Sequence, residues 1–194
     1  PSVLGMPLLE LIQKGSPEFD ETHQKHSERK LDCRPGQILL QNERRILPKP
    51  LSVIPVAQIS LYTEWRPKSS GGGLVAHHAL SIVASPKYRR GVPDTPDANK
   101  EWLGSNDLMM TTYVAVMFLD GAKWKNGVIA FQSTQLKRAR GWAREMLGVK
   151  MPGVPEGDMP PIFAAIWKLD SEPDSNEKGG WFAWKITQER VLSL

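Results

Sequence analysis

The sequence predicts a mainly β protein with one or two helices, an α+β fold. Runs rich in β-branched and aromatic residues recur from residue 37 onward, and segments rich in glycine and proline separate them. Strong helical periodicity is confined to residues 133–148. With 194 residues, 40% of them hydrophobic, the chain is long enough to bury a real core.

Residues 1–36 are predicted to form a short N-terminal helix followed by an extended arm. The apolar run LLELIQK (8–14) is assigned to the helix. The next segment, SPEFDETHQKHSERK (16–30), has turn formers and charges but no sustained period. We therefore expect the arm to lie at the periphery of a single β domain that spans residues 37–194.

From residue 37 the pattern becomes that of strands. Strands are predicted within QILLQ (37–41), LSVIPVAQISLYTEW (51–65) and LVAHHALSIVAS (74–85). Pro55 favours an edge strand or a bulge in the second of these. Residues 85–107 contain three prolines and two glycines, which predicts a long loop over the surface.

The remaining elements complete a recognisable order. TTYVAVMFLDGAKWKNGVIAF (111–131) predicts two strands around a turn, with Asp120-Gly121 and Asn126-Gly127 as hairpin signals. A helix follows at 133–148, and PIFAAIWKLDSEPDSNEKGGWFAWKIT (161–187) predicts two strands joined by a polar loop. Three antiparallel strands, a helix and two more strands is the order of an OB-like five-stranded Greek-key barrel, here with an extra hairpin and long loops.

The charge balance is mildly basic, with 25 Lys plus Arg against 21 Asp plus Glu. Between residues 123 and 150 only Glu145 offsets a block of cationic side chains, which are Lys123, Lys125, Lys137, Arg138, Arg140, Arg144 and Lys150. Such a block attracts a phosphate backbone, but an amphipathic helix also commonly carries charge on its solvated face. Both interpretations stay open from the sequence.

Signatures of enzymes, metals and membranes are scarce. The segment GGGLVAHH lacks the Lys and Ser/Thr of a phosphate-binding loop. His23, His26 and Cys33 have metal-ligand chemistry, but an evident fourth ligand is missing, so we predict no metal, cofactor or catalysis. A single cysteine favours a reducing compartment, and we expect a cytoplasmic protein with neither a signal peptide nor a membrane span.

Aromatic residues beside cations stand out instead. Bases stack on aromatic rings while Lys and Arg follow the phosphates, so this combination predicts a nucleic-acid-binding site. The candidate site residues are Tyr62, Trp65, Arg66, Lys68, Tyr88, Arg89, Arg90, Lys123, Trp124, Lys125, Lys137, Arg140, Arg144, Trp181 and Lys185.

Tryptophans in strands more often lie in the core than on a surface where bases could stack, so each tryptophan is assigned separately to the core or to the surface. In WFAWKI (181–186) we place Phe182, Trp184 and Ile186 on the core face, which leaves Trp181, Ala183 and Lys185 on the other. Trp142 is assigned to the core. Trp124, between two lysines, is predicted to expose its ring.

Three stretches resemble a family of tailed-phage and prophage proteins: KPLSVIPVAQISLYTEWRP (49–67), STQLKRARGW (133–142) and SNEKGGWFAWKI (175–186). The start LLELIQKGSPEF (8–19) is also similar to that of the family. The family resembles the OB-fold single-stranded-DNA-binding proteins of phage replication and recombination. The resemblance implies a non-catalytic, sequence-tolerant binder in the host cytoplasm whose partners are single-stranded DNA and replication or recombination proteins, with oligomers an open question.

Proteins of that kind often end in an acidic tail that recruits polymerase or helicase. Residues 188–194 here are QERVLSL. Either such a tail lies outside this sequence or that docking function is absent, and both explanations stay open.

Two other classes fit parts of the sequence. A phage structural or assembly protein would make protein contacts through the N-terminal arm and the loop at 85–107. A recombination nuclease or accessory subunit would need converging carboxylates and a divalent metal, for which Asp107, Asp120, Asp170 and Glu172 are the candidates.

Overall fold

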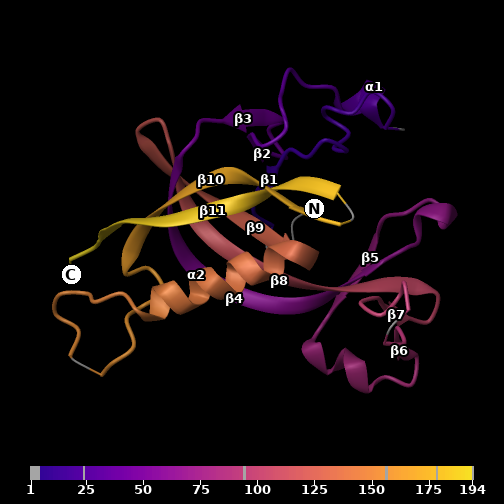
Figure 1. Cartoon of the computed structure of the whole chain (residues 1–194). Helices are drawn as coiled ribbons and strands as arrows, with labels where there is room; N and C mark the ends of the chain where they lie inside the picture. The colour runs from indigo at the N-terminus through magenta and orange to yellow at the C-terminus, as the bar shows by residue number, and fades with distance from the viewer. Residues whose placement is uncertain (1–4, 24, 94, 156, 178, 194) are drawn as a thin grey trace.

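The computed structural model describes residues 5–193 except residues 24, 94, 156 and 178. These residues form one curled eleven-stranded sheet in the order β11-β10-β4-β8-β9-β1-β2-β3, with β5, β6 and β7 attached beside β4 and β8 (Figure 1). The predicted mainly β fold with one or two helices is confirmed. The five-stranded Greek-key barrel is not, because the sheet is larger and forms only half a barrel.

Two long strands form the centre of this sheet. β4 (Leu51–Trp65) and β8 (Asn106–Asp120) pair antiparallel from Val53↔Phe118 to Trp65↔Asp107. The other edge of β4 pairs first with β10 (Ala165–Asn176) and then with β5 (Leu74–His78). The other edge of β8 pairs with β9 (Lys123–Gln132) and with β7 (Glu101–Leu103), which in turn pairs with β6 (Tyr88–Arg90).

The predicted N-terminal helix is wrong. Leu8–Leu11 is strand β1, which lies inside the sheet between β9 and β2 (Ile38–Leu40), and β3 (Arg45–Leu47) follows β2. Within β1, Leu9 and Leu11 are buried while Leu8 and Glu10 are only partly buried, which is the period of a strand. An apolar run this short does not distinguish strand from helix. The arm contains one short helix, α1 (His26–Arg29).

Several predicted strands and turns are confirmed and others shift. Pro55 lies at a register shift in β4, as predicted, and Asp120-Gly121 forms the turn between β8 and β9. Asn126-Gly127 is not a turn but part of β9, where a Cβ on Gly127 would lie 3.1 Å from the Phe118 ring. The third predicted strand ends at His78 and is followed by the 3-10 helix η2 (Leu80–Ala84). The predicted surface loop at 85–107 contains the β6–β7 hairpin.

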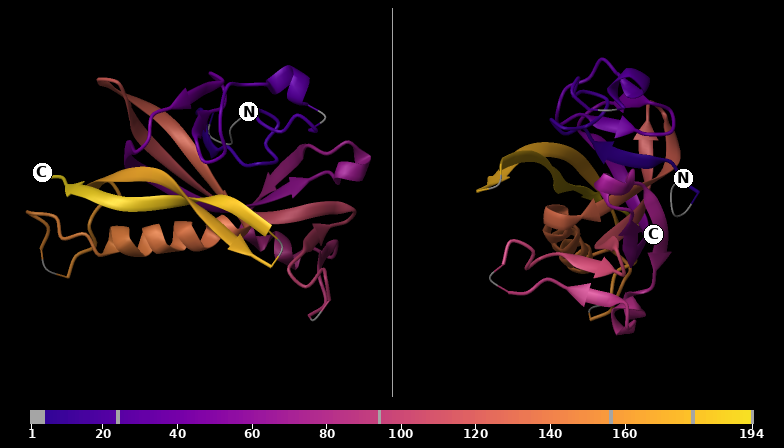
Figure 2. Two further views of the ribbon diagram at one scale, coloured as in Figure 1. Left: turned by 45° about the horizontal axis from the view of Figure 1, so that its top comes forward. Right: turned by 90° about the vertical axis from the view of Figure 1, so that its right-hand side faces the viewer.

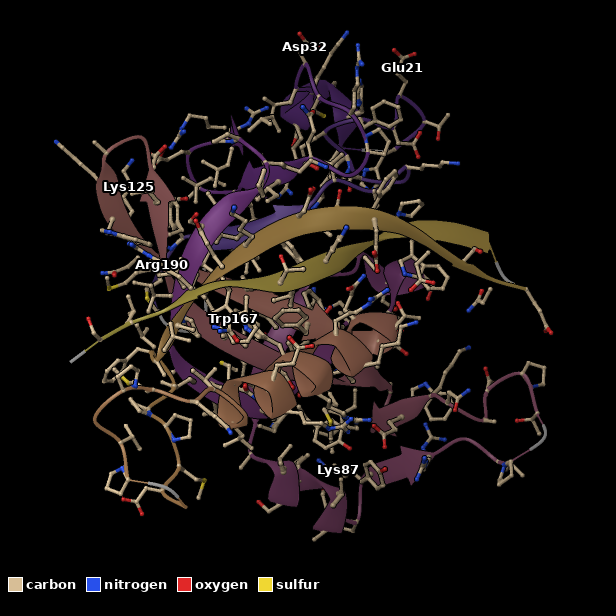
Figure 3. The ribbon with its side chains drawn as sticks, turned by 60° about the vertical axis from the view of Figure 1, so that its left-hand side comes forward. Glu21, Asp32, Lys87, Lys125, Trp167 and Arg190 are labelled. Carbon is tan, nitrogen blue, oxygen red and sulfur yellow. The ribbon has the colours of Figure 1, made fainter. Side chains whose placement is uncertain are left out.

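Helix α2 (Leu136–Leu147), preceded by the 3-10 turn η3 (Ser133–Gln135), covers the core. Its buried residues are Ala139, Trp142 and Met146. The Trp142 ring lies 6.1 Å from Trp167 and 6.3 Å from Phe131, centroid to centroid, so the assignment of Trp142 to the core is confirmed. Trp167 lies between the sheet and α2 in Figure 3.

β11 (Gly179–Val191) packs its Trp184 into the same core, as predicted. Ala183, predicted to face outward, is also buried. Figure 2 shows α2 running alongside the β10–β11 ribbon, while β5, β6, β7 and η2 project as a lobe at one end of the sheet. The 3-10 turn η1 (Lys68–Ser70) joins β4 to β5 within this lobe. None of the helices in the described part of the chain is long and apolar enough to cross a bilayer.

Replacement of Trp142 by Ala is expected to lower the free energy of unfolding by about 3 to 5 kcal/mol, because it opens a cavity against two aromatic rings. Leu147→Ala, on the exposed side of the same helix, is expected to change it by less than about 0.5 kcal/mol. Urea denaturation measures both. If Trp142→Ala does not fold, Trp142→Phe can be measured instead, and it is expected to lower the free energy of unfolding by a smaller amount. Equal stability of Trp142→Phe and wild type would contradict the assignment of Trp142 to the core.

Candidate nucleic-acid interface

The β4–β8–β9 part of the sheet has two chemically different faces. Residues paired across antiparallel strands share a face, and alternate residues change face. Val114, Val116 and Phe118 of β8 lie in the core beneath α2. We call this side the core face. The opposite side, the outer face, holds Tyr113 and Leu119 of β8 with their partners on β4 and β9.

A row of aromatic and charged residues crosses the outer face at the lobe. Trp65 pairs with Asp107, Asp107 pairs with Trp102, and Trp102 pairs with Arg89. The Arg89 guanidinium lies 5.8 Å from the centre of the Trp102 ring and donates a hydrogen bond of 2.8 Å to the Gly104 carbonyl oxygen. Arg66, directly after β4, is exposed and makes no ion pair within the described residues. Trp65 and Trp102, half-buried, therefore lie beside two cations.

A cleft of about 400 Å³ opens beside Trp65. Its walls come from β1, β4, β5, β8, β9 and β11, and they include Leu74, His77, Tyr113, Ala130, Gln132 and Gln135 besides Trp65. The His77 ring packs edge-on against Tyr113 with centroids 5.7 Å apart. This cleft is a concave surface that brings Trp65, His77 and Tyr113 together.

A buried hydroxyl network supports the floor of the cleft. Thr63 Oγ1 donates to Thr111 Oγ1 at 2.9 Å and lies 3.3 Å from Tyr113 Oη and 3.4 Å from His77 Nδ1. Gln132 Nε2 also donates to Thr111 Oγ1, at 2.9 Å. Burial, with a smaller effect of the adjacent His78, lowers the pKa of His77. Apart from the Glu10 carboxyl, the cleft therefore presents neutral polar groups and rings, which suits an uncharged heterocycle better than an anion.

At the other end of the outer face, Trp124 pairs with Leu119 near the β8–β9 turn. It is 39% exposed, so the predicted exposure of its ring is confirmed, although it lies in a strand and not in a turn. Lys123 is exposed and makes no ion pair within the described chain, whereas Lys125 binds Asp120 at 2.7 Å and Glu43 at 3.8 Å. Figure 3 shows Lys125 at this tip, away from Lys87 on the lobe.

The other candidate aromatic residues are buried or hydrogen-bonded within the protein. Tyr62 is buried, with little ring surface for a base, and its hydroxyl donates to Glu101 at 3.3 Å. Tyr88 donates to the same carboxylate at 2.7 Å, and burial raises the pKa of Tyr88 to about 12. The indole N–H of Trp181 is buried and unpaired. Arg90 and Lys185 are exposed, and the side chain of Lys68 lies outside the described part of the structure.

The cationic side chains of α2 fall into two pairs, one that forms ion pairs with β10 and one that does not. Lys137 Nζ lies 3.0 Å from Asp174, and Arg138 lies 2.7 Å from Glu172 and 3.4 Å from Asp174. Arg140 and Arg144 have no such partner within the residues described and line a second groove of about 380 Å³ between α2 and β4–β8. That groove is on the core-face side, because its floor is Gln58, Ser60, Met110 and Thr112. The structure therefore separates the helix arginines from Trp65 and Trp124.

The carboxylates considered for a nuclease do not converge on one point. Asp120 binds Arg45 and Lys125, Asp170 binds Lys49, and Glu172 binds Arg138. Across the described residues, no group of three or more His, Cys, Asp or Glu side chains is placed to hold a metal ion.

A family comparison covers almost the whole molecule. The model of the Pam3 phage gp34-like protein family matches residues 2–193. The chain belongs to this family. Its phage origin, expected from the resemblance of the sequence motifs, is thereby confirmed. No curated protein and no solved structure matches the chain.

Sequence reasoning missed Trp102, His77 and Tyr113 as members of one surface. Trp102 fell within the segment taken as a loop. A signal was present, because Gly104-Ser105 is a two-residue hairpin connection of the Gly-Ser type between Leu103 and its partner Asn106. The meeting of His77 with Tyr113 depends on the β4–β5–β8 register, for which the sequence offers no comparable local signal.

Glu10, which also lines the cleft, predicts a pH dependence. Burial, and next the nearby Glu18 carboxylate, raise the pKa of Glu10 to about 7, while Arg29 opposes the rise. A raised pKa stabilises the fold at low pH, and this stability is lost as the pH rises through about 7.

Glu10→Gln is therefore expected to match wild type near pH 4.5 and to exceed its free energy of unfolding at pH 8. The difference is expected to be on the order of 1 to 3 kcal/mol. Urea denaturation at a series of pH values measures it. An advantage of the variant that is constant with pH would contradict the shifted pKa.

Proposed function

We propose that this phage protein binds single-stranded DNA along the outer face of its sheet, without catalysis and without strong sequence preference. The observation that carries the proposal is the placement of aromatic rings at both ends of that face, each close to a free cation. Trp65 and Trp102 lie at the lobe end, where Arg66 directly follows Trp65. Trp124 lies at the other end, and Lys123 precedes it at the β8–β9 turn, on the other side of the strand.

The aromatic groups fit the stacking that single-strand binding requires. Every base has a π-face, so stacking on tryptophan tolerates sequence, and a curved sheet surface leaves unpaired bases accessible to rings. The cleft beside Trp65 adds neutral donors and acceptors from His77 and Gln132. A duplex hides its base faces, which makes the single strand the better ligand for such a surface.

The span between the two ends suits an extended ligand. Leu119, the partner of Trp124, and Asp107, the partner of Trp65, are twelve residues apart on β8, or about 40 Å in a strand. Between them the outer face exposes Ile59 and Met109. We also propose that the protein resembles OB-type single-strand-binding proteins in the way it binds DNA. Its role would then be in phage replication or recombination within the host cytoplasm.

Trp124→Ala is expected to weaken binding of a labelled oligothymidine about 5- to 150-fold, because it removes one stacked base worth about 1 to 3 kcal/mol. Trp65→Ala is expected to act in the same direction. Fluorescence anisotropy at low salt measures the affinity, with Phe163→Ala as a control because Phe163 is also an exposed aromatic residue outside this surface. Unchanged affinity in both tryptophan variants would reject the outer face as the DNA site.

Lys123→Ala is expected to change the salt dependence of the same binding. Removal of one phosphate contact lowers the steepness of log K against log salt by about 0.7 for a single strand. Lys125→Ala is the matched comparison, and a smaller effect is expected because Lys125 is already paired with Asp120. Equal slopes for wild type and Lys123→Ala would mean that Lys123 does not contact the phosphate backbone.

A further inference from the structure

One stretch of β4 lacks a strand partner on one side, although η2 also contacts β4. β10 pairs with residues 51–53 and β5 with residues 62–65, while the described chain pairs nothing with residues 54–61 along that edge. These eight residues span about 25 Å. Val56 and Ile59 within the stretch are 39% and 45% exposed. In Figure 1 this part of β4 runs below α2 along the margin of the sheet.

Such an edge offers unused backbone N–H and C=O groups in a row, which is a template for an added strand. The stretch carries no charged side chain that would repel an incoming strand, since residues 54–61 read IPVAQISL. The bulge at Pro55 restricts only one end. β10 and β5 set the two limits between which an added strand would fit.

The groove on the core-face side adjoins this edge. Gln58 and Ser60 of the unpaired stretch line it together with Arg140 and Arg144 of α2 and the apolar side chains of Leu136 and Leu147. Arg140 and Arg144 are one helical turn apart, about 6 Å along the axis. Alternate residues of an extended strand are separated by about 6.6 Å on one face. The two guanidinium groups therefore match carboxylates at alternate positions of a strand.

We propose that an acidic, extended segment of a partner protein adds to β4 at residues 54–61 and places alternate carboxylates on Arg140 and Arg144. This is strand addition, in which the backbone gives affinity and alternate side chains give specificity. The site is distinct from the proposed DNA surface, because it lies on the other face of the sheet.

Charge complementarity and the free edge together favour a peptide over a nucleic acid. Both guanidinium groups lack internal partners within the described residues, whereas their neighbours Lys137 and Arg138 are neutralised by β10. Phosphates would satisfy the arginines but could not pair with the alternating N–H and C=O groups of β4. A polypeptide satisfies both.

The probe is a fluorescent peptide of four Val-Glu repeats, which is about as long as the unpaired stretch, titrated into the full chain by anisotropy. Binding is expected to weaken at least about tenfold in Arg140→Glu/Arg144→Glu. The same variant is expected to gain binding to a Val-Lys peptide that wild type does not bind. Lys14→Glu/Lys30→Glu, with the same change of net charge on exposed arm residues, is expected to leave both affinities near wild type.

Two N-methylated peptides test strand addition itself. Methyl groups on the Val amides in one, and on the Glu amides in the other, block alternate N–H groups. One set is expected to abolish binding and the other to retain it, because only alternate amides face β4. Equal binding of both, or no binding of the unmodified peptide at about 1 mM, would overturn the proposal.

Oligothymidine binding separates this idea from the proposed function. Arg140→Glu/Arg144→Glu is expected to reduce DNA affinity no more than the Lys14→Glu/Lys30→Glu control does. A specific loss of DNA binding in the arginine variant, with no peptide binding by wild type, would assign the groove to DNA and reject the peptide. Trp124→Ala is expected to lose DNA affinity but to bind the Val-Glu peptide as tightly as wild type does.

Discussion

The pairing of β4 with β8 is the constraint on which the rest of the structure depends. Both strands are fifteen residues long, and their register runs without a shift from Ala57↔Ala115 to Trp65↔Asp107. Strands in globular proteins more often have about five or six residues. Each outer edge is therefore shared by two shorter neighbours: β10 and β5 on β4, and β9 and β7 on β8. The lobe and the unpaired stretch at 54–61 both follow from this mismatch in length.

The same pairing separates the chemistry of the two faces. Even-numbered residues of β8 such as Val114 and Val116 enter the core, so the odd-numbered ones must point away from it. Trp65 and Trp102, distant in sequence, meet on either side of Asp107 because all three occupy one cross-strand row. A shift of one residue in either register would turn one of these rings to the other face.

Features that depend on local pattern were predictable, and features that depend on register were not. The β runs, the core positions of Trp142 and Trp184 and the exposure of Trp124 follow from periodicity and neighbouring residues. β1 was not predictable, because its burial depends on contacts with β2 and β9. The neutralisation of Lys137 was hidden too, since it depends on how far β10 extends and on where α2 packs against it, which brings Asp174 to Lys137.

The separation of tryptophans from helix arginines limits what one ligand can do. A DNA single strand that contacted both Trp65 and Arg144 would have to pass around an edge of the sheet. At that edge its phosphates would meet the unpaired peptide groups of β4. Phosphates cannot pair with these N–H and C=O groups in the way that an added β-strand can. Rings with scattered cations suit stacked bases. Two guanidinium groups one turn apart beside a free strand edge suit carboxylates held by an extended backbone. The physical distinction between these surfaces therefore favours two ligands of different chemistry that bind independently.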